Sequence, residues 1–411
     1  MYPTLYHAVH SLLGLDLQWL KLVNTFGFFI ALAFLAGARC LASELGRKHA
    51  SGTLSVTRRL ETPALPPAWL DIGLSCLVAF AFGFKIFGIA SGEYTLQGGA
   101  DTRRYMLSAN GDFFGGLLAG IGWLVFKLRQ RRQLGPVPNE APEPVWVEIA
   151  PREHVLGLTG YAALGALIGA KLFHLLERPR AILELLERPS IGALFSGLTI
   201  YGGVIVGALF ALLYCRRHAL PFLHVCTSGL PGLMLGYAIG RLGCQLSGDG
   251  DWGIVSQGPL PGFDWLPPWF WAFDYPNNVM HAGVPLGSGA FAGYGTHLAP
   301  PVYPTPLYES LASLASFALL WSVRRRIERP LVMFGLYLVL NGAERFWIEK
   351  IRVNAGYDLF GRSVTQAEII SVLLFVAGVV LLLPPRKPAR ATAATPAIAA
   401  PEPTGAPEAG A

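Results

Sequence analysis

The sequence is poor in charge. Only 14% of its 411 residues are Asp, Glu, Lys or Arg, whereas 53% are hydrophobic. A soluble domain of this length needs a polar surface that this composition does not supply. The sequence therefore predicts an all-α polytopic membrane protein. The formal net charge of +6 comes mostly from basic loops between apolar runs, so we expect the lipid bilayer as a partner and no nucleic acid.

Cysteine and histidine are also scarce, and neither has the spacing of a metal site or a disulfide framework. Most of the five cysteines lie inside apolar runs, where cysteine behaves as a small buried hydrophobe. The nine histidines are scattered, without the spacing of metal ligands. We therefore expect no metal and no cofactor. The first twenty or so residues lack a basic start and a small-residue cleavage site, so we expect no cleavable signal peptide.

Apolar runs recur along residues 1–384 and predict about nine transmembrane helices, since each run is near the length that crosses the hydrocarbon core. An amphipathic lead-in over 1–21 is expected at the interface, and the Ala/Pro-rich segment 385–411 is expected to be a disordered tail. The runs cover 22–42, 67–90, 112–127, 155–176, 197–215, 222–246, 307–323, 330–348 and 366–384.

Basic residues follow every second run, as loops on the cytoplasmic side do. This pattern places the N-terminus outside and the C-terminus in the cytoplasm. The connection from Ser247 to Glu309 contains no Lys or Arg and is rich in Trp, Phe, Tyr, Pro and Gly. We therefore expect residues 247–306 to form an irregular extracytoplasmic head between the sixth and seventh helices.

Residues 67–132 and 155–218 resemble each other weakly. The stretch Gly83-Phe84-Lys85-Ile86-Phe87 is echoed by Gly169-Ala170-Lys171-Leu172-Phe173, and Gly115-Gly116 by Gly202-Gly203. Two interpretations stay open at this point. The segments are an internal repeat, or they are two helix pairs that share only a membrane composition.

The sixth run ends in a charged residue that is costly to bury. Gly232, Gly236 and Gly240 recur every four residues, which lets a neighbouring helix backbone come close. Arg241 follows directly, at the outer end of an apolar helix. A charge there is expensive unless it serves a site, and two arginines in one outer pocket suit an anionic lipid phosphate.

Other polar residues fall at the outer ends of different predicted helices, where they can meet that arginine. Each also has a structural explanation. A lysine near a helix end snorkels to the interface, tyrosines form aromatic belts, acidic residues beside glycines make turns, and charges four residues apart pair on one helix. These residues are Lys171, Tyr201 with Gly202 and Gly203, Asp249, Tyr308 with Glu309, and Arg345, Glu349 and Arg352.

With these residues in view, the chain resembles the prolipoprotein diacylglyceryl transferases. Residues 240–253, Gly-Arg-Leu-Gly through the final Gly, are similar to the family's signature. Pro304-Thr-Pro-Leu-Tyr-Glu309 is similar to its Pro-Ser-x-Leu-Tyr-Glu, and Arg345-Phe-Trp-Ile-Glu349 with Arg352 to its Arg-Phe-x-x-Glu-x-x-Arg. Residues 365–371 resemble the opening of its last helix, and 196–203 its His-Gly-Gly segment. The resemblance covers 155–384, with a weaker match at 22–47.

The chain departs from the family pattern at several positions. Cys244 stands where Asn is usual, Asp249 where Glu is usual, Tyr201 where His is usual and Phe26 where Tyr is common. The shortest members have no counterpart of 67–132, which is therefore a two-helix addition or a repeat. The changes put the identity of the catalytic base in question more than the fold.

The resemblance implies transfer of a diacylglyceryl group from phosphatidylglycerol to the cysteine thiol of a prolipoprotein signal peptide, at the periplasmic face of the bacterial inner membrane. The leaving phosphate needs positive charge, and the attacking thiol must lose its proton. Cys244 is expected to pack rather than to act as a nucleophile. The expected catalytic residues are Arg241, Arg345, Tyr201, Glu349 and Asp249, with the proton acceptor open among the last three; substrate contacts are expected from Arg241, Tyr308, Glu309, Gly202, Gly203, Arg352 and Lys171.

Two other functions fit parts of the sequence. A transporter or lipid-binding membrane protein is suggested by the repeat and the charged pocket, and an inactive family member by Tyr201 and Cys244. Transporters place charged sites near the membrane midplane, whereas these residues gather at the outer ends of helices. That difference favours the enzyme.

Overall fold

The computed structural model describes residues 1–63, 65–90, 105, 108–136, 143–179, 182, 199–259, 262–353, 356–359 and 362–383. The predicted tail, 385–411, lies outside these residues. Each of the nine predicted runs coincides with a helix over most of its described part, so the structure is mostly helical and consistent with a membrane protein. The helices are α2 (Thr25–Ala50), α3 (Trp69–Ala90), α5 (Phe113–Leu134), α6 (Val155–Glu177), α9 (Ile200–Arg217), α10 (Phe222–Ser247), α11 (Thr305–Val323), α12 (Pro330–Glu349) and α13 (Gln366–Leu382).

Five segments among the described residues are long and apolar enough to cross a membrane: α2, α3, α6 with the short helix before it, α10 and α12. The helix α13 is apolar but shorter. That α5, α9 and α11 also span the bilayer stays a prediction, because they are not among these five segments.

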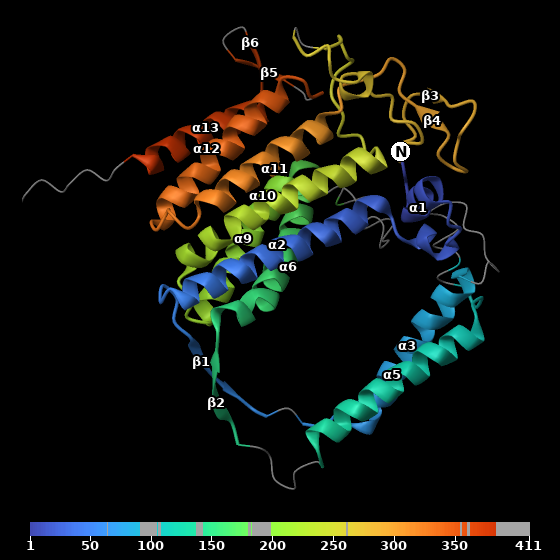
Figure 1. Cartoon of the computed structure of the whole chain (residues 1–411), viewed down its shortest axis with the longest axis vertical. Helices are drawn as coiled ribbons and strands as arrows, with labels where there is room; N and C mark the ends of the chain where they lie inside the picture. The colour runs from blue at the N-terminus through green and yellow to red at the C-terminus, as the bar shows by residue number, and fades with distance from the viewer. Residues whose placement is uncertain are drawn as a thin grey trace, which may run out of the picture.

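The large helices form a layer in which α2, α10, α11, α12 and α13 follow one another (Figure 1). The antiparallel pair α6–α9 packs beside α2 and α10, while the pair α3–α5 lies apart from the layer. A two-stranded ribbon connects the two hairpins, with β1 (Thr57–Glu61) antiparallel to β2 (Val145–Ile149). The end of this layer that holds the candidate site, described below, is therefore built by α10, α11 and α12. The pair α3–α5 does not contribute to it.

The glycine ridge of α10 packs against α2, as the sequence predicted. A methyl group added to Gly232 would lie 2.9 Å from the carbonyl oxygen of Gly37, and one on Gly236 would lie 3.4 Å from that of Ala33. A side chain at Gly232 would therefore force the backbones apart, whereas a methyl group at Gly236 would make an ordinary van der Waals contact. The close crossing fixes the position of α10, and with it the residues at its C-terminal end.

The helix pairs α3–α5 and α6–α9 each form a hairpin. Within each hairpin the two helices are joined by the same pattern of contacts. A methyl group added to a glycine of the first helix would collide with a glycine carbonyl of the second, and one on that second glycine would collide with a Phe of the first helix. A backbone N–H at the cap of the second helix donates to a carbonyl of the first. These contacts join Gly83 to Gly115, Gly115 to Phe87 and Asp112 to Phe84 in α3–α5, and Gly169 to Gly202, Gly202 to Phe173 and Thr199 to Ala170 in α6–α9.

The segment between α10 and α11 is irregular over its described residues, as predicted. It contains the short helix η3 (Pro268–Phe270) and the two-residue strands β3 (Val284–Pro285) and β4 (Thr296–His297). The buried side chain of Asn278 ties it together by donating to the carbonyl oxygens of Tyr275 (3.2 Å) and Ala282 (3.0 Å). The Tyr275 hydroxyl donates to Gln245 of α10 at 2.7 Å, so this head is fastened to the end of α10.

The chain start also packs at this end. The helix α1 (Leu5–Leu13) and the 3₁₀ helix η1 (Gln18–Leu22) precede α2, and the N–H of Tyr2 donates to the carbonyl oxygen of Leu246 at 2.8 Å. Exposed apolar side chains along this lead-in, such as Leu12 and Leu13, suit an interfacial position. Shorter elements complete the structure: η2 (Pro151–His154) before α6, and β5 (Gly356–Leu359) paired with β6 (Arg362–Thr365) before α13.

Candidate active site

Four charged side chains meet where α10, α11 and the end of α12 converge. Nε of Arg241 lies 2.7 Å from Oε2 of Glu309, and Nη1 of Arg241 pairs with Asp251. Arg352 binds the same two carboxylates, with Nη1 3.0 Å from Oε1 of Glu309 and Nη2 2.9 Å from Oδ1 of Asp251. Each arginine therefore bridges both acids, and each acid bridges both arginines.

The cluster is buried unevenly. The side chain of Glu309 is 0% exposed and that of Arg241 10%, whereas Asp251 is 38% exposed. Two positive and two negative charges balance, which makes their burial tolerable. Because Glu309 has no access to solvent, it is the fixed member of the cluster, and Asp251 is the member closest to the surface.

Neighbouring groups hold the four charges in place. Tyr237, one helical turn before Arg241, donates its hydroxyl to Glu309 and accepts from Nε of Arg241 at 3.1 Å. The hydroxyl of Thr305 donates to the carbonyl oxygen of Asp251 at 2.7 Å. Sequence reasoning did not single out Tyr237, although its spacing of four residues from Arg241 on one helix was a usable signal.

The last glycine of the signature has a steric reason. The N–H of Gly253 donates to the carbonyl oxygen of Tyr303 at 2.9 Å. A methyl group on Gly253 would lie 2.6 Å from the carbonyl oxygen of Ile351. Only glycine therefore lets the loop after α10 lie between these two segments, which brings Asp251 within reach of Arg352.

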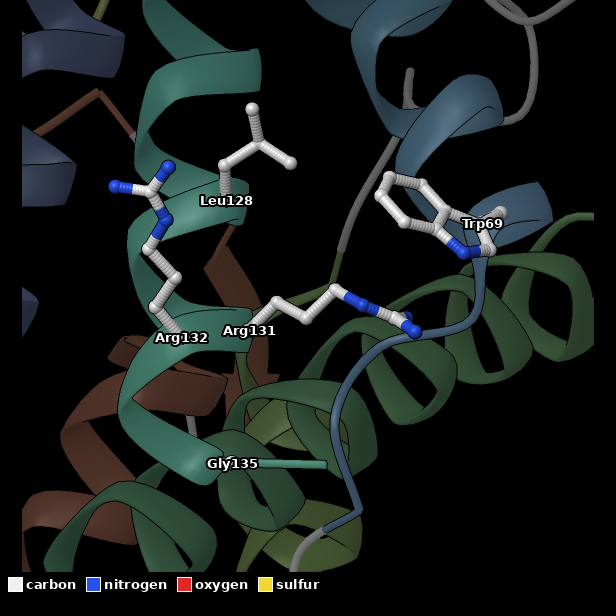
Figure 2. Close-up of a pocket in the computed structure, with 5 residues that line it drawn as sticks. All are labelled: Trp69, Leu128, Arg131, Arg132 and Gly135. Atoms are coloured by element: carbon white, nitrogen blue, oxygen red, sulfur yellow. The ribbon is translucent and has the colours of Figure 1, made fainter. Parts of the chain in front are cut away.

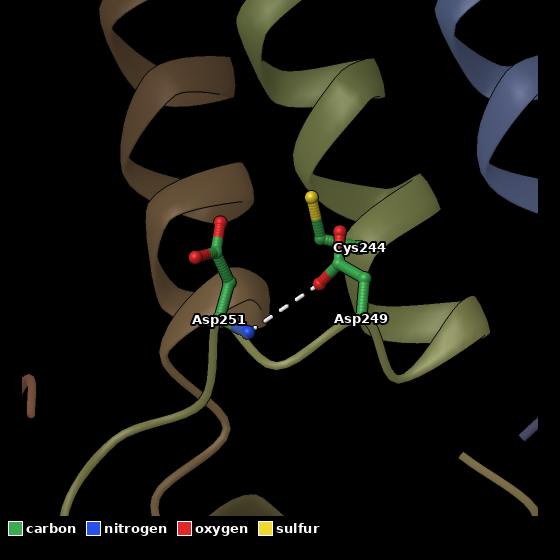
Figure 3. A group of neighbouring side chains, drawn as sticks. All are labelled: Cys244, Asp249 and Asp251. Atoms are coloured by element: carbon green, nitrogen blue, oxygen red, sulfur yellow. Dashed lines mark hydrogen bonds between the residues drawn. The ribbon is translucent and has the colours of Figure 1, made fainter. Parts of the chain in front are cut away.

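Asp249 lies behind the cluster, beside Cys244 (Figure 3). Its Oδ1 accepts from the N–H of Asp251 at 3.4 Å. Burial raises the pKa of the Asp249 carboxyl, which makes it a stronger proton acceptor. Burial acts in the same direction on Asp251, but the guanidiniums of Arg241 and Arg352 prevail and lower its pKa.

Cys244, Asp249 and Asp251 bring one possible ligand atom each to within 4.8 Å of one another. The expectation of no metal rested on scattered histidines and did not consider this group. Both oxygens of Asp251 already pair with guanidiniums, and two nearby positive charges repel a cation. The donor set of this group therefore suits a metal ion poorly.

The arginine that shares the carboxylates with Arg241 is Arg352, whereas sequence reasoning gave this place to Arg345. Arg345 pairs instead with Glu349, Nη2 to Oε2 at 3.0 Å, one turn apart on α12. Glu309, expected to contact the substrate, holds Arg241 and Arg352 in the structure. The difference arises because α12 ends at Glu349, so Arg352 leaves the helical face and turns toward the loop.

Tyr308 contacts the head rather than the charge cluster. Its hydroxyl donates to the carbonyl oxygen of Phe270, and the two rings lie 5.1 Å apart. This contact attaches the head to the start of α11, directly before Glu309. Tyr308 therefore has a positioning role in the structure as described.

The Tyr201-Gly202-Gly203 segment lies at the start of α9, and residues 196–198 of the same motif fall outside the described residues. Gly202 packs against Phe173 of α6, and a methyl group on Gly203 would lie 3.2 Å from the carbonyl oxygen of Ala166. Both glycines thus serve the α6–α9 crossing. Within the described residues, no hydrogen bond or ion pair joins Tyr201 to the charge cluster.

Lys171 lies on α6 near the same end of the hairpin. Its counterpart in the other hairpin, Lys85, donates Nζ to three backbone carbonyls of residues 105–110, at 2.6 to 2.8 Å. A lysine at this position can therefore fasten the loop that joins the two helices. This is the structural alternative to a substrate contact by Lys171.

Glu344 is the second residue that sequence reasoning missed. It stands next to Arg345 on α12, and its Oε1 is buried without a hydrogen-bond partner among the described residues. Glu309 and Arg241 both act on it electrostatically. A buried carboxyl oxygen without a partner is costly, and such a group beside a charged site is a candidate for proton transfer.

The comparisons with known proteins cover the part of the chain that carries this site. The profile of the prolipoprotein diacylglyceryl transferase family matches residues 119–384, which include every residue of the charge cluster. A phosphatidylglycerol–prolipoprotein diacylglyceryl transferase of Leptospira interrogans is 30% identical over 226 residues, 49% of this chain and 63% of that protein. The enzyme of that name from Bifidobacterium adolescentis is 26% identical over 238 residues, 56% of this chain and 66% of its own length.

A relative from Streptomyces coelicolor, named phosphatidylglycerol–prolipoprotein diacylglyceryl transferase 2, is 29% identical over 243 residues, 58% of this chain and 68% of that protein. The chain thus spans slightly less than two thirds of the first two relatives. The family profile begins within α5, so α3 lies outside the matched part. Because that profile covers well over half of the sequence, the chain belongs to the prolipoprotein diacylglyceryl transferase family.

Proposed function

We propose that the protein transfers the diacylglyceryl group of phosphatidylglycerol to the cysteine thiol of a prolipoprotein signal peptide. The observation that carries the proposal is the buried pair Arg241–Arg352, held by two shared carboxylates in a member of this family. In the reaction, the sulfur forms a bond to the glycerol carbon that bears the phosphate. The carbon–oxygen bond breaks, and glycerol phosphate leaves with the bonding electrons.

The two arginines suit the leaving phosphate. The pairs of Arg241 use Nε and Nη1, and Nη2 makes no hydrogen bond within the described residues. A lipid phosphate that approaches from the surface meets Asp251 first, since Asp251 is 38% exposed and Glu309 is 0%. Displacing Asp251 lets the phosphate bind both guanidiniums and keeps the charge of the cluster in balance.

Glu344 is our choice for the proton acceptor. Glu309 and Asp251 are engaged with the arginine pair, and Glu349 with Arg345. Asp249 lies beside Cys244 (Figure 3) and is not a member of the four-residue charge cluster. The Oε1 of Glu344 is buried without a hydrogen-bond partner, and no ion pair engages Glu344 within the described part of the chain. A thiol that donates its proton there becomes the thiolate, which is the competent nucleophile.

The site should face the periplasm from the inner membrane, which gives it access to lipid and to exported preproteins. The charge cluster lies at the C-terminal end of α10, beside the head that lacks Lys and Arg. The opposite ends of the helices carry basic residues, such as Arg47 and Lys48 on α2 and Arg216 and Arg217 on α9. This asymmetry supports a cytoplasmic position for the basic ends.

The test is lipid transfer from labelled phosphatidylglycerol to a synthetic prolipoprotein in reconstituted membranes. Arg241→Ala should lower the rate by at least about a hundredfold, since a lost donor to developing charge costs that much. Glu344→Gln should lower the rate of transfer as strongly, while lipid still binds. Trp347→Phe changes an exposed position on the same helix and serves as the control, with transfer expected to be unchanged. Unchanged transfer by Arg241→Ala would refute the proposed role of the cluster.

A lipid-binding or transporter-like protein would bind phosphatidylglycerol and form no thioether. An inactive family member would fail to support growth of a strain depleted of its own transferase, although it inserts normally. Product formation by the wild-type chain therefore separates the proposed enzyme from both alternatives.

A further inference from the structure

Two cavities lie at corresponding ends of the two helical hairpins. One, of about 920 Å³, lies between β1, the start of α6 and the end of α9. The other, of about 390 Å³, lies between the start of α3 and the end of α5 (Figure 2). Both are at the ends where the basic residues gather. The proposed active site is near the other end of α10, whose 26 residues span roughly 40 Å.

The cavities share their chemistry as well as their place. In α6–α9 an arginine at the end of the second helix, Arg217, reaches an aromatic residue of the first, donating to the Tyr161 hydroxyl at 3.4 Å. In α3–α5 the guanidinium of Arg131 lies 4.4 Å from the ring centre of Trp69. Figure 2 shows Arg131 extended toward Trp69 across the cavity. The two hairpins thus repeat an arginine–aromatic arrangement together with their glycine contacts.

The larger cavity is positively charged. Arg58, Arg59 and Arg217 line it, and no carboxylate is among its described lining residues. Arg58 pairs with Glu148 at 2.9 Å, but both side chains are more than half exposed, so this pair is weak. Burial, reinforced by the charges of Arg59 and Arg217, lowers the pKa of His218 in the cavity wall. The positive charges of the neighbouring arginines thus act on this histidine in the same direction as burial.

The walls of this cavity are tied together by ring contacts and hydrogen bonds. Tyr214 is 6% exposed, and its ring lies 4.2 Å from that of His218. The hydroxyl of Tyr214 is 3.2 Å from Nδ1 of His154, whose Nε2 is 2.8 Å from the hydroxyl of Thr57 on β1. This chain of hydrogen bonds attaches the ribbon to the hairpin, so the arginines of β1 are held beside Arg217.

We propose that both cavities bind phosphate groups, and that the phosphates belong to headgroups of anionic lipids in the membrane leaflet opposite the active site. Guanidiniums bind phosphate oxygens in pairs. Basic pockets between membrane helices on the cytoplasmic side suit such headgroups. The paired cavities then fix the two hairpins at one depth in the bilayer, independently of the transfer reaction.

Hydrogen exchange of the full chain in nanodiscs tests the proposal. Discs of phosphatidylcholine alone are compared with discs that also contain phosphatidylglycerol, and a third sample receives inorganic phosphate with phosphatidylcholine. We expect protection of peptides around 54–61 and 213–219, and around 67–70 and 128–135, with phosphatidylglycerol. Peptides at 247–253 report the active site separately, so binding there cannot be mistaken for binding in the cavities.

Matched variants assign the effect to the cavities. Arg217→Gln and Arg131→Gln should each weaken the protection at their own hairpin by about tenfold in lipid concentration, the loss of one charge-assisted hydrogen bond. Arg216→Gln and Arg129→Gln remove the same charge from exposed neighbours outside the cavity linings. These two variants should retain the protection from hydrogen exchange. Protection by inorganic phosphate as well would identify the free anion as a ligand of the same sites.

Two results would overturn the proposal. One is equal protection in discs with and without phosphatidylglycerol and with no effect of phosphate. The other is an equal loss for the cavity arginines and their exposed neighbours, which would reduce the effect to general surface charge. A comparison of thermal midpoints of the four variants in phosphatidylcholine discs shows whether any has lost its fold before lipid is added.

Discussion

The substitution Glu309→Gln tests the electrostatic logic of the charge cluster most directly. It keeps the size of the side chain and removes one negative charge from a position that is 0% exposed. Glu309 lies 2.7 Å from Arg241 and 3.0 Å from Arg352, and it accepts from Tyr237. The variant leaves two guanidiniums facing one carboxylate, with a net positive charge in a buried place.

Breaking a buried pair from one side costs about 3–5 kcal/mol, because the remaining charge is left uncompensated. The lower figure applies if water reaches the guanidinium of Arg352, and the upper if the cluster stays closed. An exposed pair gives the reference: Arg58 and Glu148 are 71% and 55% exposed, so Glu148→Gln should cost about 1 kcal/mol or less. We therefore expect Glu309→Gln to lower the free energy of unfolding clearly more than Glu148→Gln does.

The assay is reversible unfolding in mixed micelles, with the double variant Glu309→Gln, Arg352→Gln completing the cycle. Removing both charges restores neutrality, so the double variant should be less destabilised than the sum of the single variants, by about 1–3 kcal/mol. Additive effects, or a cost for Glu309→Gln no larger than that for Glu148→Gln, would contradict the view that the cluster is held by charge balance.

Three further predictions concern neighbouring features. Because arginines lower the pKa of Asp251, its charge stabilises the fold above about pH 4. That contribution should disappear as the pH falls through the lower native pKa, so wild type and Asp251→Asn should converge in unfolding titrations at acid pH. Gly202→Ala should lower the thermal midpoint of the chain much more than Gly160→Ala, because a methyl group at Gly160 meets nothing within 4 Å. Cys244→Ala should retain lipid transfer within about fivefold in the same assay, since a packing role leaves the chemistry to other groups.

The helices could be predicted well from the sequence, because an apolar run bounded by charge has few other solutions in a membrane. The spacing of the glycines alone predicted that a helix backbone would come close at Gly232, and the structure shows that this helix is α2. Arg241 was recognised for a similar reason: its charge is expensive at the end of an apolar helix, so a purpose was implied before any partner was known.

The partners of Arg241 could not be predicted in the same way. Arg345 and Arg352 lie on one face of an ideal helix, and the sequence analysis placed Arg345 among the catalytic residues and Arg352 among the substrate contacts. The helix ends at Glu349, and a bridge between Gly253 and Arg352 turns the second arginine toward Asp251. Helix ends are the least predictable part of a pattern. Glu344 was missed because a lone carboxyl in an apolar run gives no sign of whether a partner reaches it.

The crossing of α2 and α10 holds α10 at one point along its length. That point is Gly232, where an added methyl group would lie 2.9 Å from the carbonyl oxygen of Gly37. Arg241 lies nine residues further along the helix, roughly 13 Å at 1.5 Å per residue. A small tilt of α10 about Gly232 therefore moves the guanidinium of Arg241 sideways relative to Glu309, which lies on α11. Substitutions at Gly232 should act on the distant charges through this geometry, so the ridge contributes to the position of the charge cluster without touching it.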